Sequence, residues 1–325
     1  MTNAAKRRSR PVDLAERFGL LAVLIAVIAT FAVTQTDTFW SKAFFRNVGG
    51  NESVLAIAAL GVLLPLIAGN IDLSVGANVG ICAIASAAVI TRFHAGWGAA
   101  IIITIMLGAG IGFVNGVVVS RLRTNSFIIT LGTATIIAGA VQWYTKGRSV
   151  LGTFPRTFTH LAIGTWWGVP RTVYYVVVIA LVLWYLLDHT PFGRYLYSIG
   201  SNREAARLVG LRVDRLELGA FVMAGFIAAI AGVLQTARQG NGAPQPSVAT
   251  LVLPALAAVF VGATVYQPGR FNVWGTLTAV AFVRFLVYGL ELSGVAPWVE
   301  QVVTGGALVV AVVASSLLSR HRTGG

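Results

Sequence analysis

An isolated acid, Asp72, is the residue whose chemistry stands out first in this sequence. It lies in the polar stretch 69–74, Gly-Asn-Ile-Asp-Leu-Ser, which separates two apolar runs, and the next acid along the chain is Asp188. If these runs cross a bilayer, an exposed carboxylate at its midplane costs about 2.5–3.5 kcal/mol. We therefore expect Asp72 to cap the N–H groups of the helix that begins after it. Contact with a solute, or coupling to a proton or ion, are the functional alternatives.

Other polar residues inside apolar runs are candidates for lining a pathway, although such side chains more often form hydrogen bonds between helices. Arg284 lies two helical turns before Glu291, with Tyr288 between them on the same face. We expect Arg284 to form a structural ion pair with Glu291 or with another helix rather than to bind a substrate. The remaining candidates for a pathway are Asn115, Thr130, Thr133 and Gln142.

The segment 189–215 combines five arginines with the signals of a short helix. Ser201 and Glu204 have the spacing of a capping box, in which each side chain satisfies a backbone N–H group at the start of a helix. Gly210 supplies the left-handed position at which such a helix can end. The pattern predicts an exposed helix of about two turns. A basic, capped helix of this kind can also lie on anionic lipid.

Gly108, Gly112 and Gly116 repeat every four residues and therefore share one face of a helix. Small residues at this spacing let two membrane helices approach closely, so we interpret them as packing positions. A dinucleotide-binding turn is excluded because no strand precedes these glycines.

Several kinds of chemistry are missing from the sequence. The four histidines are scattered and Cys82 is the single cysteine, so neither a metal cluster nor a disulfide framework is expected. None of the three lysines belongs to a phosphate-binding G-x-x-x-x-G-K-[ST] loop, so we expect no ATPase activity in this chain. No Ser/His, HExxH or paired-Asp constellation supports an intramembrane enzyme.

The composition defines the elements that must hold these residues. Of 325 residues, 56% are hydrophobic and only 11% are charged, and the mean hydropathy is +0.79. Such a chain cannot be a soluble enzyme, a disordered chain or a disulfide scaffold, and it is typical of a polytopic membrane protein. The net charge of +13 comes from Lys and Arg at the edges of apolar runs, which is unlike the contiguous basic patch of a nucleic-acid-binding protein.

We predict an all-α membrane protein with about ten transmembrane helices. Residues 1–17 form a basic cytoplasmic tail, 18–318 form a single transmembrane domain, and 319–325 form a second cytoplasmic tail. Lys and Arg concentrate on the side of the N-terminus, which predicts both termini inside the cell. No small-residue cleavage site follows the first apolar run, so we interpret it as an uncleaved span. The predicted spans are 18–34, 53–68, 74–90, 97–119, 126–143, 173–188, 216–236, 251–266, 273–290 and 298–318.

Four stretches resemble one family of membrane proteins. Residues 204–210, Glu-Ala-Ala-Arg-Leu-Val-Gly, match the E-A-A-x-x-x-G motif of permease subunits of ABC importers. Residues 69–77 are similar to the G-G-I-D-L-S-V-G of ribose-type permeases, and residues 127–133 to their F-I-V-T-L-G-T. Residues 192–200 resemble the F-G-R-x-x-x-A-I-G that precedes the coupling helix in this family. The sequence is therefore similar to sugar-importing ABC permeases of the ribose/xylose/simple-sugar family.

The resemblance has local departures. Residues 252–257 read Val-Leu-Pro-Ala-Leu-Ala where many members have E-L-D-A-I-A, and residues 266–270 replace the usual G-G-R-G turn. Residues 124–126, Thr-Asn-Ser, stand where the family usually has prolines. These departures suggest a side branch of the family, leave the substrate and the partner subunit open, and keep the coupling motif intact.

The resemblance implies a permease of the bacterial inner membrane that pairs with a second permease chain, identical or different, and with an ABC ATPase that holds the ATP. It implies that a sugar-binding protein docks outside the cell. Nucleosides or branched-chain amino acids are alternative substrates, and a secondary transporter coupled to ions through Asp72 is a further alternative, although no inverted repeat supports it. The residues implied in ATPase coupling are Ser201, Asn202, Arg203, Glu204, Ala205, Ala206 and Gly210.

Overall fold

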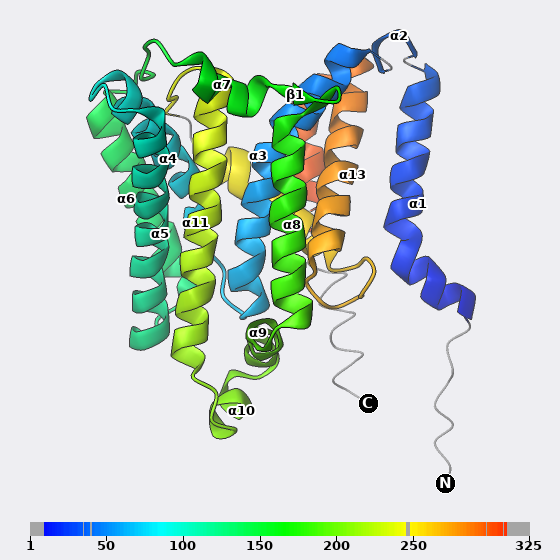
Figure 1. Ribbon diagram of the computed structural model, residues 1–325. Coiled ribbons are helices and arrows are strands. Elements are labelled where there is room, and N and C mark those ends of the chain that lie inside the picture. The colour runs from blue at the N-terminus through cyan, green and yellow to red at the C-terminus, as the bar shows by residue number, and fades with distance from the viewer. Residues whose placement is uncertain are drawn as a thin grey trace. The chain divides into compact units, whose positions relative to one another are not determined.

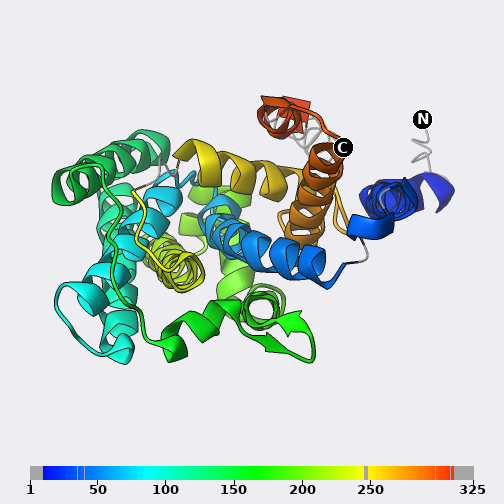
Figure 2. The ribbon, with the colours of Figure 1, turned by 90° about the horizontal axis from the view of Figure 1, so that it is seen from above.

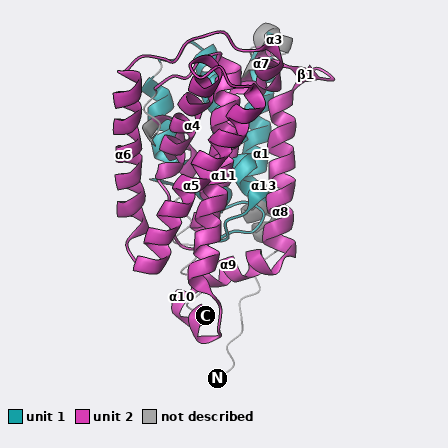
Figure 3. Cartoon of the chain, turned by 60° about the vertical axis from the view of Figure 1, so that its left-hand side comes forward, with its two compact units in different colours: residues 1–36, 257–325 teal, residues 37–256 magenta. Residues whose placement is uncertain are grey.

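The computed structural model describes residues 10–34, 36–39, 41–244, 248–296, 298–307 and 309–310. Two compact units make up the chain. One contains residues 1–36 and 257–325, and the other contains residues 37–256 (Figure 3).

The larger unit, 37–256, is a helical bundle with α11 in its interior. α11 packs against α3, α4 and α5, and Figure 2 shows it end-on among them. α6 lies at the edge of the unit and leaves most of its surface exposed. The elements are α2 (Thr36–Phe39), α3 (Lys42–Ile67), α4 (Ser74–Thr91), α5 (Trp97–Leu122), α6 (Ser126–Thr145), α7 (Arg156–Ile163), β1 (Thr165–Trp166), β2 (Val169–Pro170), α8 (Arg171–His189), α9 (Pro191–Ser201), α10 (Arg203–Leu208), α11 (Val213–Gln239) and the π-helix η1 (Val248–Val252).

Glycine allows α5 and α11 of this unit to pack in close contact. A Cβ atom on Gly108 would lie 2.7 Å from the Ala229 Cβ and from the Gly225 carbonyl oxygen. A Cβ on Gly112 would overlap the carbonyl of Phe221. The three glycines of the predicted packing face, Gly108, Gly112 and Gly116, all meet α11 of the same chain. In a membrane such close van der Waals packing is a main source of helix association.

The two ends of the larger unit carry different elements (Figure 1). α9 and α10 lie at one end. α7 and the hairpin β1–β2 lie at the opposite end, between the predicted spans 126–143 and 173–188. Trp167 and Gly168 connect the two strands with φ values of +49° and +84°, as in the primed turns that suit short hairpins.

The smaller unit contains α1 (Arg10–Thr34), α13 (Val273–Leu292) and most of α12 (Leu253–Gly262). α1 packs along α13, and Gly289 of α13 leaves the space that the Phe31 ring fills. Arg284 forms an ion pair with Glu300 at 2.6 Å and lies over the Tyr288 ring at 5.2 Å. Of the two predicted alternatives, the ion pair with another helix is confirmed, because Glu300 lies in the helical residues 298–307 that follow α13.

Seven described helices are long and apolar enough to cross a membrane, and they match the predicted spans from 53–68 to 216–236 and 273–290. The predicted span 18–34 is the apolar part of the longer helix α1. The span 251–266 is wrong in extent, because η1 passes into α12 and α12 ends at Gly262. Pro254 lacks the N–H group of a regular helical turn, which favours the wider π-helical start. Of the span 298–318, residues 298–307 and 309–310 are described and helical, and the rest of it lies outside the described residues together with the tail 319–325.

Candidate functional site: the α9–α10 end and the break at 68–73

α9 is a helix that the sequence analysis missed. Pro191 occupies its first position, where a missing N–H group costs nothing, and one face of the helix is buried through Leu196 and Ile199. Gly193 is required near the start, because a Cβ there would overlap the carbonyl of Leu187 at the end of α8. The segment predicted as one short helix is thus two helices, of which α9 packs on the bundle and α10 projects beyond it (Figure 1).

The start of α10 differs from the predicted capping box. Ser201 is the last residue of α9, so it cannot cap α10. Asn202 is the N-cap instead, and its Oδ1 accepts the Ala205 N–H at 2.9 Å. Gly210 has the predicted left-handed backbone, with φ +85°, and donates its N–H to the Arg207 carbonyl at 3.0 Å. Both Ser201 and Asn202 have side chains that could cap α10, and Asn202 takes this position because α9 extends through Ser201.

α10 turns one side toward the bundle and leaves the other open. Ala206 is buried in a small cluster with Ile199 of α9 and Val213 of α11. Glu204 and Ala205 are exposed, and the apolar side chains of Leu208 and Val209 are exposed to 89% and 77%. Neighbouring apolar residues presented in this way typically mark a protein interaction surface.

Two ion pairs join α10 to α11. Arg203 contacts Glu217 at 2.6 Å, and Arg207 contacts Asp214 at 2.7 Å. The two pairs differ in burial, since the Glu217 side chain is fully buried whereas the Asp214 side chain is 46% exposed. Glu217 was not singled out from the sequence. An acid near the start of an apolar span was the signal that could have found it.

The break at 68–73, between α3 and α4, lies beside the end of α9. Gly69 has a φ of +82°, and a Cβ on it would lie 3.6 Å from the Gly200 Cα. A Cβ on Gly200 would in turn overlap the Ile67 carbonyl. Two glycines thus bring the backbone of the break into direct contact with the backbone of α9.

Asp72 is buried in this break and binds the start of α4. Its Oδ1 accepts the backbone N–H of Ser74 at 2.9 Å and the Ser74 hydroxyl at 2.6 Å. The formal N-cap is Leu73, so Asp72 performs the predicted capping from one position earlier. Burial raises the pKa of the Asp72 carboxyl to about 6, while the two hydrogen bonds from Ser74 act to lower it.

A chain of buried and partly buried hydrogen bonds continues from Asp72 across the bundle. Asn115 of α5 donates to the Ser74 hydroxyl at 2.7 Å and accepts from Thr133 of α6 at 2.7 Å. Thr130 of α6 accepts the Leu73 N–H at 3.1 Å. Of the residues predicted along a pathway, Asp72, Asn115, Thr130 and Thr133 are therefore brought together. Gln142 is exposed near the other end of α6 and does not join them.

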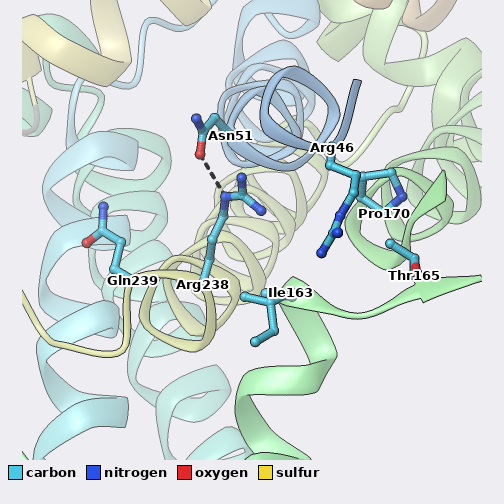
Figure 4. Close-up of a pocket in the computed structure, with 8 residues that line it drawn as sticks. Arg46, Asn51, Ile163, Thr165, Pro170, Arg238 and Gln239 are labelled. Carbon is cyan, nitrogen blue, oxygen red and sulfur yellow. Dashed lines mark hydrogen bonds between the residues drawn. The ribbon is translucent and has the colours of Figure 1, made fainter. Parts of the chain in front are cut away.

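A pocket of about 430 Å³ lies at the opposite end of the unit, and sequence analysis did not anticipate it. Figure 4 shows Arg46 of α3 and Arg238 of α11 reaching into it. The Arg238 Nε donates to the Asn51 Oδ1 at 2.7 Å, and its guanidinium occupies the space left by the missing side chain of Gly50. The lining residues are Arg46, Asn51, Ala162, Ile163, Thr165, Pro170, Arg238 and Gln239. Within the described part of the chain, no group of three His, Cys, Asp or Glu residues could hold a metal ion.

Residues 47–312 match a family model described as the permease component of a branched-chain amino acid transport system. The chain belongs to this permease family. The match covers the break at 68–73, α9, α10 and all seven long apolar helices. Membership defines the chain as a multi-pass membrane permease of the ABC importer class.

The permease is similar along its whole length to proteins named for sugar import. It is 33% identical to the ribose import permease protein RbsC of Escherichia coli (strain K12) over 318 residues, which cover 96% of this chain and 97% of that protein. It is 30% identical to the galactose/methyl galactoside import permease protein MglC of Haemophilus influenzae, with 97% and 98% covered. It is 27% identical to the D-allose transport system permease protein AlsC of Escherichia coli (strain K12), with 94% and 93% covered. No solved structure matches the permease.

Proposed function

We propose that this permease forms half of the membrane pore of an ATP-driven, binding-protein-dependent importer of a sugar, such as a ribose-type monosaccharide or a related polyol. The proposal rests on the three relatives named above, which are named for the import of ribose, galactose or methyl galactoside, and D-allose. The family model is named for branched-chain amino acids, which keeps amino acids, and with them nucleosides, as the alternative substrates.

The projecting helix α10 is the observation that carries the proposed coupling to an ATPase. It is held at its start by Asn202 and at its end by Gly210, and it presents Leu208 and Val209 away from the bundle. A short rigid helix with an apolar tip fits a groove on a partner protein. The partner is an ABC ATPase that binds and hydrolyses the ATP, and the permease itself needs no cofactor.

The two ends of the larger unit then take opposite sides of the bacterial inner membrane. The α9–α10 end, with its arginines, faces the cytoplasm, in agreement with the excess of positive charge on cytoplasmic segments. The end with the hairpin and the pocket at Arg46 and Arg238 faces outward and receives the sugar-binding protein. Ten spans with both termini inside, and a second permease chain of the same or a different kind, complete the importer.

Gentle purification of the tagged permease from its native membrane tests this function. We expect a stoichiometric ATPase in the preparation of the unmodified chain, and its loss when Glu204→Lys and Gly210→Val are combined. Arg156→Ala, on α7 at the opposite end, is the matched control and keeps the ATPase.

Transport is then measured with the reconstituted complex, its binding protein and radiolabelled D-ribose. Uptake into proteoliposomes that requires ATP supports the proposal. A permease that purifies alone and moves solute without ATP contradicts it and favours an ion-coupled transporter acting through Asp72.

A further inference from the structure

The contact between α10 and α11 contains two ion pairs of nearly equal length but unequal burial. The Arg203–Glu217 pair places a carboxylate with a fully buried side chain opposite a guanidinium that is 33% exposed. The Arg207–Asp214 pair lies at the rim, where the two side chains are 30% and 46% exposed. Arg203 is the cation in direct contact with Glu217, while Arg207 acts on it from farther away and Asn70 donates a hydrogen bond to it. A buried carboxylate depends on such partners far more than an exposed one, which water also solvates.

The buried pair therefore fixes the distance between two helices. Glu217 lies one turn inside α11, and Arg203 is the first residue of α10. If α10 moved away without α11, the Glu217 carboxylate would remain in the bundle without its charge partner. Separating the exposed pair has a much smaller cost, because both groups regain water.

The α9–α10 element also touches the bundle at a second point. Gly200 of α9 lies against the backbone of Ile67 and Gly69, where the break at 68–73 begins. Ile199, Ala206 and Val213 connect α9, α10 and the start of α11 through one buried cluster. A displacement of α10 therefore reaches α11 through the ion pair and reaches the break through α9.

The break is connected to the rest of the bundle by hydrogen bonds rather than by apolar packing alone. The backbone N–H groups of Ile71 and Leu73 donate to the hydroxyls of Ser126 and Thr130 on α6, each at 3.1 Å. Asp72 binds the first residue of α4, as described above. Movement at Gly69 is thus able to reach α4 and α6 together.

We propose that Arg203 and Glu217 are positioning residues, and that their buried ion pair transmits the ATP-driven movement of α10 to α11 and to the break at 68–73. This inference rests on the proposed function, and it identifies the contact that couples the ATPase to the transmembrane helices. The exposed pair, Arg207–Asp214, holds the same two helices without transmitting the movement.

The experiment compares Glu217→Gln with Asp214→Asn, two substitutions that each remove one charge from α11 and keep the side chain's shape. Both are made in the full complex of permease, ATPase and binding protein. The measurements are the amount of ATPase bound, the rate of ATP hydrolysis, the D-ribose uptake per ATP, and the thermal melting temperature. Hydrogen exchange of residues 68–74, with and without MgATP and vanadate, reports on the break whatever the transported solute is.

We expect Glu217→Gln to bind the ATPase and hydrolyse ATP as the unmodified complex does. Its uptake per ATP falls about fivefold or more, at the lower bound of typical coupling between sites, and the nucleotide-dependent change in exchange at 68–74 disappears. Asp214→Asn retains both responses. Retention of both responses by Glu217→Gln overturns the inference. Loss of the ATPase from a Glu217→Gln complex that melts like Asp214→Asn also overturns it, because the pair then only shapes the docking surface.

If Glu217→Gln does not accumulate in the membrane, Arg203→Lys decides the question. Lysine keeps the charge beside Glu217 but replaces the planar fork with a single flexible ammonium group. A reduced exchange response at 68–74 supports the inference, and an unchanged response overturns it. An unmodified permease that binds no ATPase contradicts the proposed function itself, which is a different result from an unaltered Glu217→Gln complex.

Discussion

Replacing Gly108 by alanine tests whether the α5–α11 contact requires a glycine. The new Cβ would lie 2.7 Å from both the Ala229 Cβ and the Gly225 carbonyl oxygen, and 3.1 Å from the Asn78 Oδ1. Because carbon atoms in contact are normally about 3.5–4.0 Å apart, the two helices must separate by roughly 1 Å. Overpacking of this kind typically costs about 1–3 kcal/mol.

Gly110→Ala is the matched control on the same helix, because a Cβ at Gly110 meets nothing within 4 Å. Both substitutions gain the same helix propensity, about 1 kcal/mol, so this contribution cancels in the comparison. We expect Gly108→Ala to be less stable than Gly110→Ala by about 1–3 kcal/mol. Unfolding in mixed detergent micelles with increasing SDS measures the difference. Equal stability of the two variants would refute the close packing of α5 on α11.

Three further substitutions test the caps and the buried hydrogen bonds. Asn202→Ala removes the N-cap of α10 and should destabilise that helix by about 1 kcal/mol, seen as faster hydrogen exchange at 203–208, whereas Ser201→Ala should not. Thr133→Val should cost about 1 kcal/mol in SDS unfolding by removing the donor to a buried amide, and Thr135→Val, exposed on the same helix, should be nearly neutral. Asp72→Asn retains an oxygen that can cap α4, so ATP-driven D-ribose uptake should persist. A loss of uptake in Asp72→Asn with an unchanged melting temperature would assign the charge a role in transport.

The sequence predicted those features of this permease that depend on neighbouring residues, such as the long helices, a helix end and a packing face. Long apolar runs placed seven helices, because a spanning segment must be long and uncharged. Gly210 was predicted because a helix needs a left-handed residue at its end, and the spacing of Gly108, Gly112 and Gly116 predicted one shared face. Each of these signals lies within one turn or one helix of the residue that it describes.

The features that were missed depend on contacts between distant parts of the chain. Glu217 pairs with Arg203, which lies fourteen positions earlier. The end of α10 and a turn separate the two residues, so the spacing rules for side chains on one helix do not apply to them. The partner of Arg284 in another helix, Glu300, could not be identified by number for the same reason, because it lies sixteen positions later. Asn202 rather than Ser201 caps α10 because the packing of α9 extends that helix through Ser201.

Asp72 and Glu217, the acids that are buried in the described part of the larger unit, differ in what they connect. Asp72 accepts both of its hydrogen bonds from Ser74, two residues away, so its carboxylate stabilises one helix start and the backbone around it. Glu217 faces a guanidinium from another helix, and that helix is the one which projects from the bundle. The hydrogen bonds of Asp72 therefore stabilise the start of α4 alone, whereas the ion pair of Glu217 also determines how α10 is placed against α11. Because a buried charge without its partner is costly, Glu217 and Arg203 must move together, and this makes them the better candidates for the coupling of the permease to ATP.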